Sequence, residues 1–209
     1  MPRPIDYYFS VVSPWAYIGH APFMDIVRRH GLSVNYKPVS LGSVFAQTGG
    51  LPLPQRAPAR QRYRLVELQR WRDRRGMAFK VHPKHWPSDV KLADRFAIAI
   101  QAAHGDPDLF LRRAFRAIWE EERNLADPEV IAALARDAGL EPQPLFDLAH
   151  GTTAEALYAL NLENALAADV FGSPAYVLDG EVFWGQDRLD LLDDALASGR
   201  SAYTPDTAA

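Results

Sequence analysis

Cysteine is absent from this sequence of 209 residues. The chain therefore has no disulfide, no thiolate ligand for a metal, and no cysteine nucleophile or redox dithiol of its own. A chain without cysteine is compatible with a cytoplasmic location, which we expect here. The N-terminal stretch MPRPIDYYF also lacks the apolar core of a signal peptide.

Long apolar runs and a strong net charge are also missing. No run reaches the ~18 residues of a membrane span, and the formal net charge is only −3. We therefore expect neither a membrane partner nor a nucleic-acid partner. Residues 56–75 do contain eight arginines, but Leu65, Leu68 and Trp71 recur among them at helical spacing. This pattern favours a solvated helix face over a nucleic-acid surface.

The order of the expected elements predicts an α/β fold. Residues 5–12 are predicted to form a strand, a helix should run from Pro14 to Gly31, and a second strand should follow at 32–41. After a loop at 49–58, helical patterns follow one another at 59–75, 89–104, 107–123, 127–138, 142–150 and 153–169. Strands at 176–178 and 181–184 and a helix at 187–197 should close the chain, with a frayed tail after Gly199.

Without its helical middle, this order is the thioredoxin arrangement, βαβ followed by ββα. We therefore predict a thioredoxin-like fold with a large all-helical insertion. Residues 1–41 and 170–209 are assigned to the thioredoxin-like domain, and residues 42–169 to an inserted helical domain.

The stretch VVSPWAYIG, residues 11–19, places Ser13 directly before Pro14 at a predicted helix start. Ser-Pro is a common N-terminal cap, so Ser13 either caps the helix only or also has a chemical role. It lacks the G-x-S-x-G pattern of a hydrolase nucleophile. A hydroxyl at a helix N-terminus can, however, donate a hydrogen bond to a thiolate and so lower the pKa of that thiol. The thiol would belong to another molecule, because this chain has none.

A second candidate is the stretch DVFGSPAYV, residues 169–177. Gly172, Ser173 and Pro174 precede a predicted strand and indicate a turn, and Pro174 is a candidate for a cis peptide bond. In thioredoxin-like proteins a cis proline faces the start of the first helix. The main chain of the preceding residue, here Ser173, could then pair with a peptide-like ligand.

A third candidate is FWGQDRL, residues 183–189, where the last helix is predicted to begin. Gln186 and Asp187 either cap that helix or bind a ligand. In the second case Asp187 would offer its carboxylate to an ammonium group, while nearby backbone N–H groups bind a ligand carboxylate.

His82 and His85 have a spacing compatible with a metal site. Pro83 lies between them and no third ligand is evident, so we expect a pair of loop histidines and no metal.

Taken in order around a helical insertion, FSVVSPWAYIG, DVFGSPAYVLDG and VFWGQDRL resemble segments of a known family. They resemble the 2-hydroxychromene-2-carboxylate isomerases and the kappa-class glutathione transferases, over residues 4–197. RYRLVELQRW is also similar to a helix of the isomerases. The resemblance implies a DsbA-like member of the thioredoxin superfamily that binds glutathione as its cofactor.

The resemblance also implies roles for single residues. Ser13 would be the catalytic residue that faces the glutathione sulfur, and the main chain at Ser173, before Pro174, would pair with the cysteinyl part of glutathione. The γ-glutamyl end would be held by four consecutive residues, Trp184, Gly185, Gln186 and Asp187. The second substrate would contact residues of the insertion, namely Phe45, Gln55, Arg56 and Trp86.

The sequence departs from the family pattern at three places near this site. Ser10 stands where the family often has an aspartate just before the active-site turn. Gln55 or Arg56 stands in the region where the family often has an asparagine. Phe45 and Ala46 occupy positions at which an isomerase would contact its substrate, so these departures concern the second substrate more than glutathione.

The resemblance implies a glutathione-dependent isomerase that acts on an unsaturated, aromatic-derived acid. Two alternatives use the same thiol site: a kappa-like transferase that conjugates glutathione to small electrophiles, and a glutathione- or peptide-binding protein without turnover. Because dimers are usual in the family, the resemblance also implies a homodimer.

Overall fold

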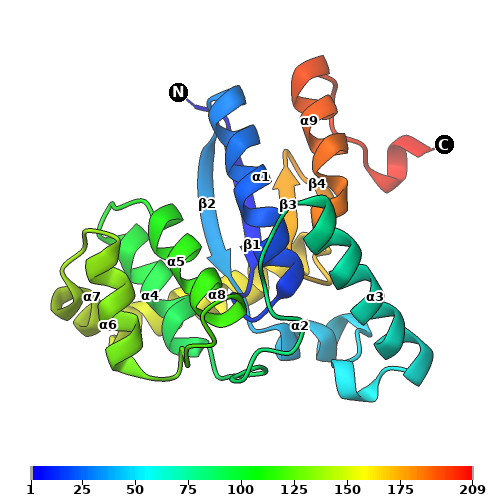
Figure 1. Ribbon diagram of the computed structural model, residues 1–209. Helices are drawn as coiled ribbons and strands as arrows, with labels where there is room; N and C mark the ends of the chain where they lie inside the picture. The colour runs from blue at the N-terminus through cyan, green and yellow to red at the C-terminus, as the bar shows by residue number, and fades with distance from the viewer. Residues whose placement is uncertain (1, 209) are drawn as a thin grey trace.

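The computed structural model describes residues 2–208, and within them the strands form a four-stranded mixed sheet (Figure 1). The strands are β1 (Pro4–Phe9), β2 (Ser33–Pro38), β3 (Ala175–Leu178) and β4 (Glu181–Trp184). Their order in the sheet is β2-β1-β3-β4, and only the pair β1 and β2 is parallel. The predicted βαβ and ββα halves therefore meet in one sheet, through the pairing of β1 with β3.

Helices surround this sheet on both faces. They are α1 (Pro14–His30), α2 (Leu41–Thr48), α3 (Pro58–Arg74), α4 (Lys91–Ala102), α5 (Asp108–Trp119), α6 (Pro128–Asp137), α7 (Pro142–His150), α8 (Thr152–Ala167) and α9 (Leu189–Ser198). Short 3-10 turns are η1 (Leu53–Gln55), η2 (Gln186–Arg188) and η3 (Pro205–Ala208). Among residues 2–208, none of the helices combines the length and the apolar character that crossing a membrane requires.

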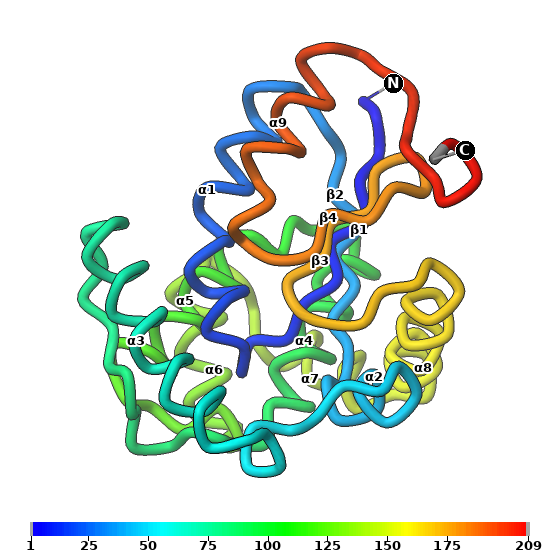
Figure 2. The backbone as a smooth tube through the Cα atoms, turned by 90° about the vertical axis from the view of Figure 1, so that its right-hand side faces the viewer, coloured from blue at the N-terminus to red at the C-terminus, as the bar shows by residue number. Residues whose placement is uncertain are grey.

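The side chains of β1 alternate between the two faces of the sheet, as expected for a strand. Tyr7 and Phe9 belong to the larger buried cluster, whereas Tyr8 belongs to a smaller one. The larger cluster lies on the face covered by α1 and α9 and continues into α4, α5 and α6, and the smaller one lies under α2 and α8 (Figure 2). Tyr7 and Tyr176 are cross-strand partners with stacked rings 5.4 Å apart. The boundaries of an inserted helical domain stay a prediction.

Most predicted helices are confirmed within a few residues, but α2 was not predicted. The predicted second strand ran to residue 41, whereas β2 ends at Pro38 and a helix begins after Ser40. The Ser40 side chain caps this helix by accepting a hydrogen bond from the backbone N–H of Ser43 at 3.4 Å. Val44 is the buried residue of this helix, and one buried position does not produce the repeating apolar pattern by which a helix is predicted from sequence.

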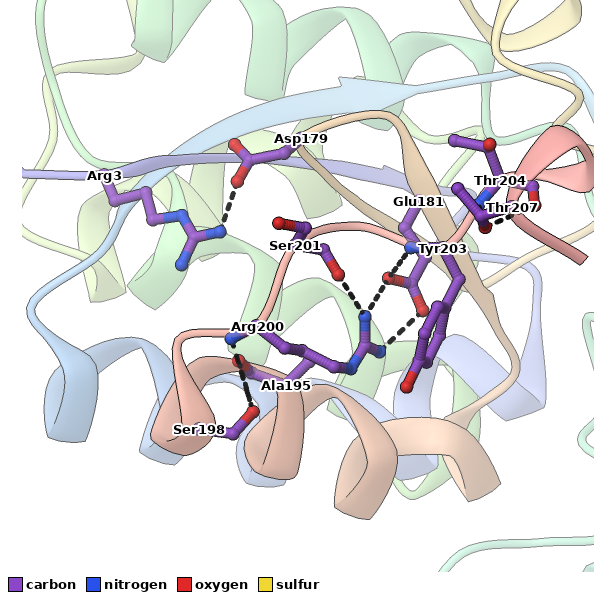
Figure 3. Close-up of polar contacts among 10 residues, drawn as sticks. All are labelled: Arg3, Asp179, Glu181, Ala195, Ser198, Arg200, Ser201, Tyr203, Thr204 and Thr207. Carbon is purple, nitrogen blue, oxygen red and sulfur yellow. Dashed lines mark hydrogen bonds and ion pairs between the residues drawn. The ribbon is translucent and has the colours of Figure 1, made fainter.

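Part of the C-terminal tail, which the sequence predicted to be frayed, is bound to the β3–β4 hairpin through Arg200 and Tyr203 (Figure 3). Both Arg200 terminal nitrogens donate to the two carboxylate oxygens of Glu181, at 2.7 and 2.8 Å. The backbone N–H of Tyr203 donates to the same carboxylate, and the Tyr203 ring lies 3.8 Å from the Arg200 guanidinium. The paired arginine holds the pKa of Glu181 below its usual range.

Candidate functional site

Ser13 caps the first helix of the fold. Its backbone is extended, with φ of −83° and ψ of 118°, and its Oγ accepts a hydrogen bond from the backbone N–H of Ala16 at 3.2 Å. The same hydroxyl donates its proton to the backbone carbonyl of Ser173, also at 3.2 Å. Ser13 is 4% exposed. It therefore joins the start of α1 to the turn before β3, two segments that lie 160 positions apart in the sequence.

The turn at Ser173 and Pro174 is fixed from both sides. The peptide bond between these residues is cis, as the sequence pattern suggested. The Ser173 Oγ accepts a hydrogen bond from the backbone N–H of Ser10 at 3.2 Å. On the other side, the Pro174 carbonyl accepts one from the backbone N–H of Gly185 at 2.9 Å. The cis turn is thus anchored to the end of β1 and to the residue after β4.

Trp184 and Gly185 follow the last strand and lie beside this turn. Gly185 has a φ of 100°, a region that glycine adopts without steric cost. The Trp184 indole lies directly against Gly172, since a Cβ added at Gly172 would meet Nε1 at 2.3 Å. The Trp184 ring also packs against Phe171, at 4.7 Å between ring centroids, and 49% of Trp184 remains exposed. The indole therefore presents a large apolar surface next to Ser173.

Gln186 and Asp187 form the short turn η2 that leads into α9. Gln186 is almost fully buried, because its Cβ and Cα pack closely against Gly19 of α1. Its Oε1 accepts a hydrogen bond from Arg75 at 3.4 Å. Asp187 is exposed and its Oδ2 accepts a hydrogen bond from Arg188 at 2.7 Å. Gln186 is thus held in place by packing, whereas Asp187 is free to exchange its arginine partner for a ligand ammonium.

These segments border a cleft of about 660 Å³. One side consists of Ser173 and residues 184–188, Trp15 lies at the start of α1, and α3 forms the opposite wall. The residues from α3 and the loop before it are Arg56, Ala59, Arg60, Tyr63, Arg64, Glu67 and Trp71. Ser13 is not itself a lining residue, but its neighbour Trp15 and its hydrogen-bond partner Ser173 are. Two residues close to Ser13 therefore border the cleft.

Residues 4–197 match the family of the DsbA-like thioredoxin domain. The chain belongs to this family. The match covers both halves of the sheet and all helices from α1 to α8, so the predicted fold class is confirmed.

Relatives of this DsbA-like protein match over almost their whole length. A 2-hydroxychromene-2-carboxylate isomerase of Sphingobium xenophagum is 26% identical, over 94% of this chain and 99% of the relative. Glutathione S-transferase kappa 1 of Caenorhabditis elegans is 24% identical, over 94% and 91%. A solved structure of a 2-hydroxychromene-2-carboxylate isomerase has a TM-score of 0.79 at 23% identity, with 93% of this chain and 95% of that one covered. These relatives support a family of glutathione-related isomerases and transferases.

Four residues were predicted to contact a second substrate, and the DsbA-like fold places them unequally. Arg56 lines the cleft, and its guanidinium lies 5.7 Å from the Phe45 ring centroid. Phe45 packs against Gly50, and Gln55 is exposed at the end of η1; neither is among the lining residues of the cleft. Trp86 lies behind the wall, where its Nε1 donates to the carbonyl of Val12 at 2.9 Å.

Two further residues near the site were not singled out from the sequence. Arg64 of α3 lines the cleft and is buried, with its guanidinium 4.7 Å from the Trp86 ring centroid. Asp94 of α4 is fully buried beneath the loop that leads to Ser13 and accepts a hydrogen bond from Tyr158 Oη at 3.2 Å. The sequence around these two residues did not indicate that they would be buried, because each stands among other charged residues on a helix.

Burial raises the pKa of the Asp94 carboxyl well above its usual range. The hydrogen bond from the Tyr158 hydroxyl opposes this shift, but it is a smaller effect than burial. Asp94 therefore brings a carboxyl group from α4 to the loop that contains Ser10.

Metal ligands do not cluster in the described part of the chain. Among residues 2–208, no group of three or more His, Cys, Asp or Glu side chains is arranged to hold a metal ion. His82 and His85 lie in the loop between α3 and α4.

Proposed function

We propose that this DsbA-like protein is a glutathione-dependent isomerase of the 2-hydroxychromene-2-carboxylate isomerase type. The observation that carries the proposal is the position of Ser13: a hydroxyl at a helix N-terminus, hydrogen-bonded to the main chain of Ser173, beside a cleft of about 660 Å³. A cleft of this size is in the range that suits small-molecule ligands. The isomerase relative, matched over 99% of its length, supports the same assignment.

The chain offers two donors for a sulfur anion at this position. In the first turn of α1, Pro14 has no N–H and the N–H of Ala16 already donates to Ser13 Oγ. Trp15, which lines the cleft, would therefore contribute the helix N–H that meets an anion there. The Ser13 hydroxyl would be the second donor, after its proton turns from the Ser173 carbonyl to the ligand.

The lining residues also fit the rest of glutathione. The exposed Asp187 carboxylate suits an α-ammonium group, and the main chain at Ser173 borders the cleft, where it can pair with a peptide. Glutathione, when bound, would supply the thiolate that adds reversibly to an unsaturated aromatic-derived acid. Ser13 would stabilise that thiolate, and the apolar faces of Trp15 and Trp184 would exclude water from it.

The proposal is tested first by binding. Trp15 and Trp184 line the cleft, so glutathione should change the tryptophan fluorescence of the protein. Isomerisation of 2-hydroxychromene-2-carboxylate should then require glutathione and should not consume it. If glutathione does not bind at all, or if isomerisation proceeds equally without it, the proposal is wrong.

A transferase of the kappa type is a second candidate, since a relative of that name is 24% identical over 94% of this chain. The same thiolate would then displace a leaving group from an electrophile. Assays with the chromene acid and with chlorodinitrobenzene, run side by side, separate the two reactions. Binding of glutathione with neither reaction would indicate a binding protein without turnover.

A further inference from the structure

Arg64 differs in burial from the other arginines of residues 56–75, which are exposed or half-buried. Of the eight arginines within residues 56–75, it alone is buried in the described structure, with 8% of its surface exposed. Its Nη2 is buried and has no hydrogen-bond partner among the described residues. No carboxylate of the described residues forms an ion pair with it either.

This placement is costly for a guanidinium. Removing a cation from water destabilises a protein unless a partner compensates for the lost hydration. Burial, together with the nearby charge of Arg56, lowers the pKa of Arg64 to about 10, so the group still carries its charge at neutral pH. The Trp86 ring, 4.7 Å away, compensates in part through a cation–π contact. A stacked ring leaves the N–H groups along the edge of the guanidinium without acceptors.

Arg64 also lines the cleft, together with Ser173 and Gln186. A planar guanidinium fork matches the two oxygens of a carboxylate, and such pairs are strong when they are shielded from water. Arg64 is held by Trp86, which in turn donates to the Val12 carbonyl, one residue before Ser13. The fork is therefore positioned relative to the start of α1.

We propose that Arg64 binds a carboxylate group of the ligand that occupies the cleft. Two ligands offer this chemistry: an aromatic carboxylic acid in the second-substrate position, and glutathione itself. The glutathione source rests on the proposed function, whereas the aromatic-acid source does not require glutathione to bind.

The test compares carboxylates with their uncharged counterparts by calorimetric titration. Salicylate is paired with salicylamide, and glutathione with its glycyl ethyl ester. In the wild type, at least one carboxylate should bind about tenfold or more tightly than its counterpart. Arg64→Gln should abolish that preference. Arg62→Gln is the matched control, since Arg62 is exposed on the same helix and does not line the cleft.

The pair that loses its preference identifies the source of the carboxylate. A preference that persists in Arg64→Gln for both pairs would overturn the proposal, as would the lack of any preference in the wild type. Failure of glutathione to bind, with salicylate still dependent on Arg64, would reject the proposed function and leave this inference standing.

A folding control separates binding from a structural role. Because Arg64 has no partner to lose beyond Trp86, Arg64→Gln should melt at or above the wild-type temperature. Arg64→Lys, which keeps the charge but not the fork, should retain only part of the preference for carboxylates. A lower melting temperature with unchanged binding would make Arg64 a purely structural residue and would refute the assignment.

Discussion

Replacing Ser13 with alanine should separate the capping role of this residue from its chemical role. The hydroxyl accepts from Ala16 N–H and donates to the Ser173 carbonyl. Loss of an N-cap costs about 1 kcal/mol and loss of a neutral hydrogen bond about 1 kcal/mol, so the variant should lose about 2 kcal/mol of unfolding free energy. For a chain of this size, that loss lowers the melting temperature by about 4 to 8 °C.

The chemical role of Ser13 is measured separately, through the pKa of the thiol of bound glutathione. A hydrogen bond to a charged acceptor contributes about 1.5 to 3 kcal/mol, which corresponds to about one to two pKa units. Ser13→Ala should therefore raise the pKa of the bound thiol by about one to two units. The assay is a pH titration of the thiolate absorbance in the ultraviolet, with glutathione saturating the protein. The acid limb of the activity profile should move upwards by the same amount.

Ser40→Ala provides the matched control. Ser40 is the N-cap of α2, with its Oγ bound to the N–H of Ser43, and it does not line the cleft beside Ser13. This variant should lose about 1 kcal/mol of stability and leave the thiol titration unchanged. If Ser13→Ala loses stability but titrates like the wild type, Ser13 is only a helix cap, and the reasoning about its proton is refuted.

Two other substitutions test the surroundings of the site. Asp94→Asn should stabilise the protein increasingly as the pH rises. The raised pKa of Asp94 means that the folded state keeps a proton that the unfolded state releases above about pH 4, so unfolding free energy falls with rising pH through that window. Urea denaturation of the wild type and of Asp94→Asn at about pH 5 and about pH 8 checks this. An equal difference in unfolding free energy between the two proteins at both pH values would contradict the prediction. Gly19→Ala should destabilise by about 1 to 3 kcal/mol and weaken ligand binding, because its Cβ would meet Gln186 Cβ at 2.6 Å. Gly42→Ala should instead not destabilise the protein, because a Cβ added at Gly42 has nothing within 4 Å. Similar melting temperatures for the two variants would argue against the steric explanation.

Local signals in the sequence predicted much of the fold. Asp127 before Pro128 indicated a helix start, and its carboxylate accepts from the N–H of Glu129 at 2.9 Å. Gly31 indicated the end of α1, which it reaches with a φ of 61°. Asp179 and Gly180 indicated the hairpin between β3 and β4. Each of these signals acts within a few residues, which is why sequence alone carries them.

The candidate site was predictable only where short motifs border it. Ser13 and Ser173 are marked by the prolines that follow them, and the structure brings them within hydrogen-bond distance. Arg64 and Asp94 carry no such mark, since burial of one charged residue among many depends on which helices pack together. Tertiary contacts, not local pattern, decide that α3 faces Trp184 across the cleft.

The weak packing of helix α3 affects how the cleft responds to its ligand. Of its 17 residues, only Arg64 and Leu68 are buried, so little packing holds this wall against the rest of the fold. Local opening should therefore cost less free energy in α3 than in the sheet, and its amide protons should exchange with solvent earlier. A bound ligand bridging the cleft would slow that exchange in α3 more than elsewhere. A wall with few core contacts can also vary in sequence at little cost to stability, which leaves substrate preference free to diverge while the serine turn stays fixed.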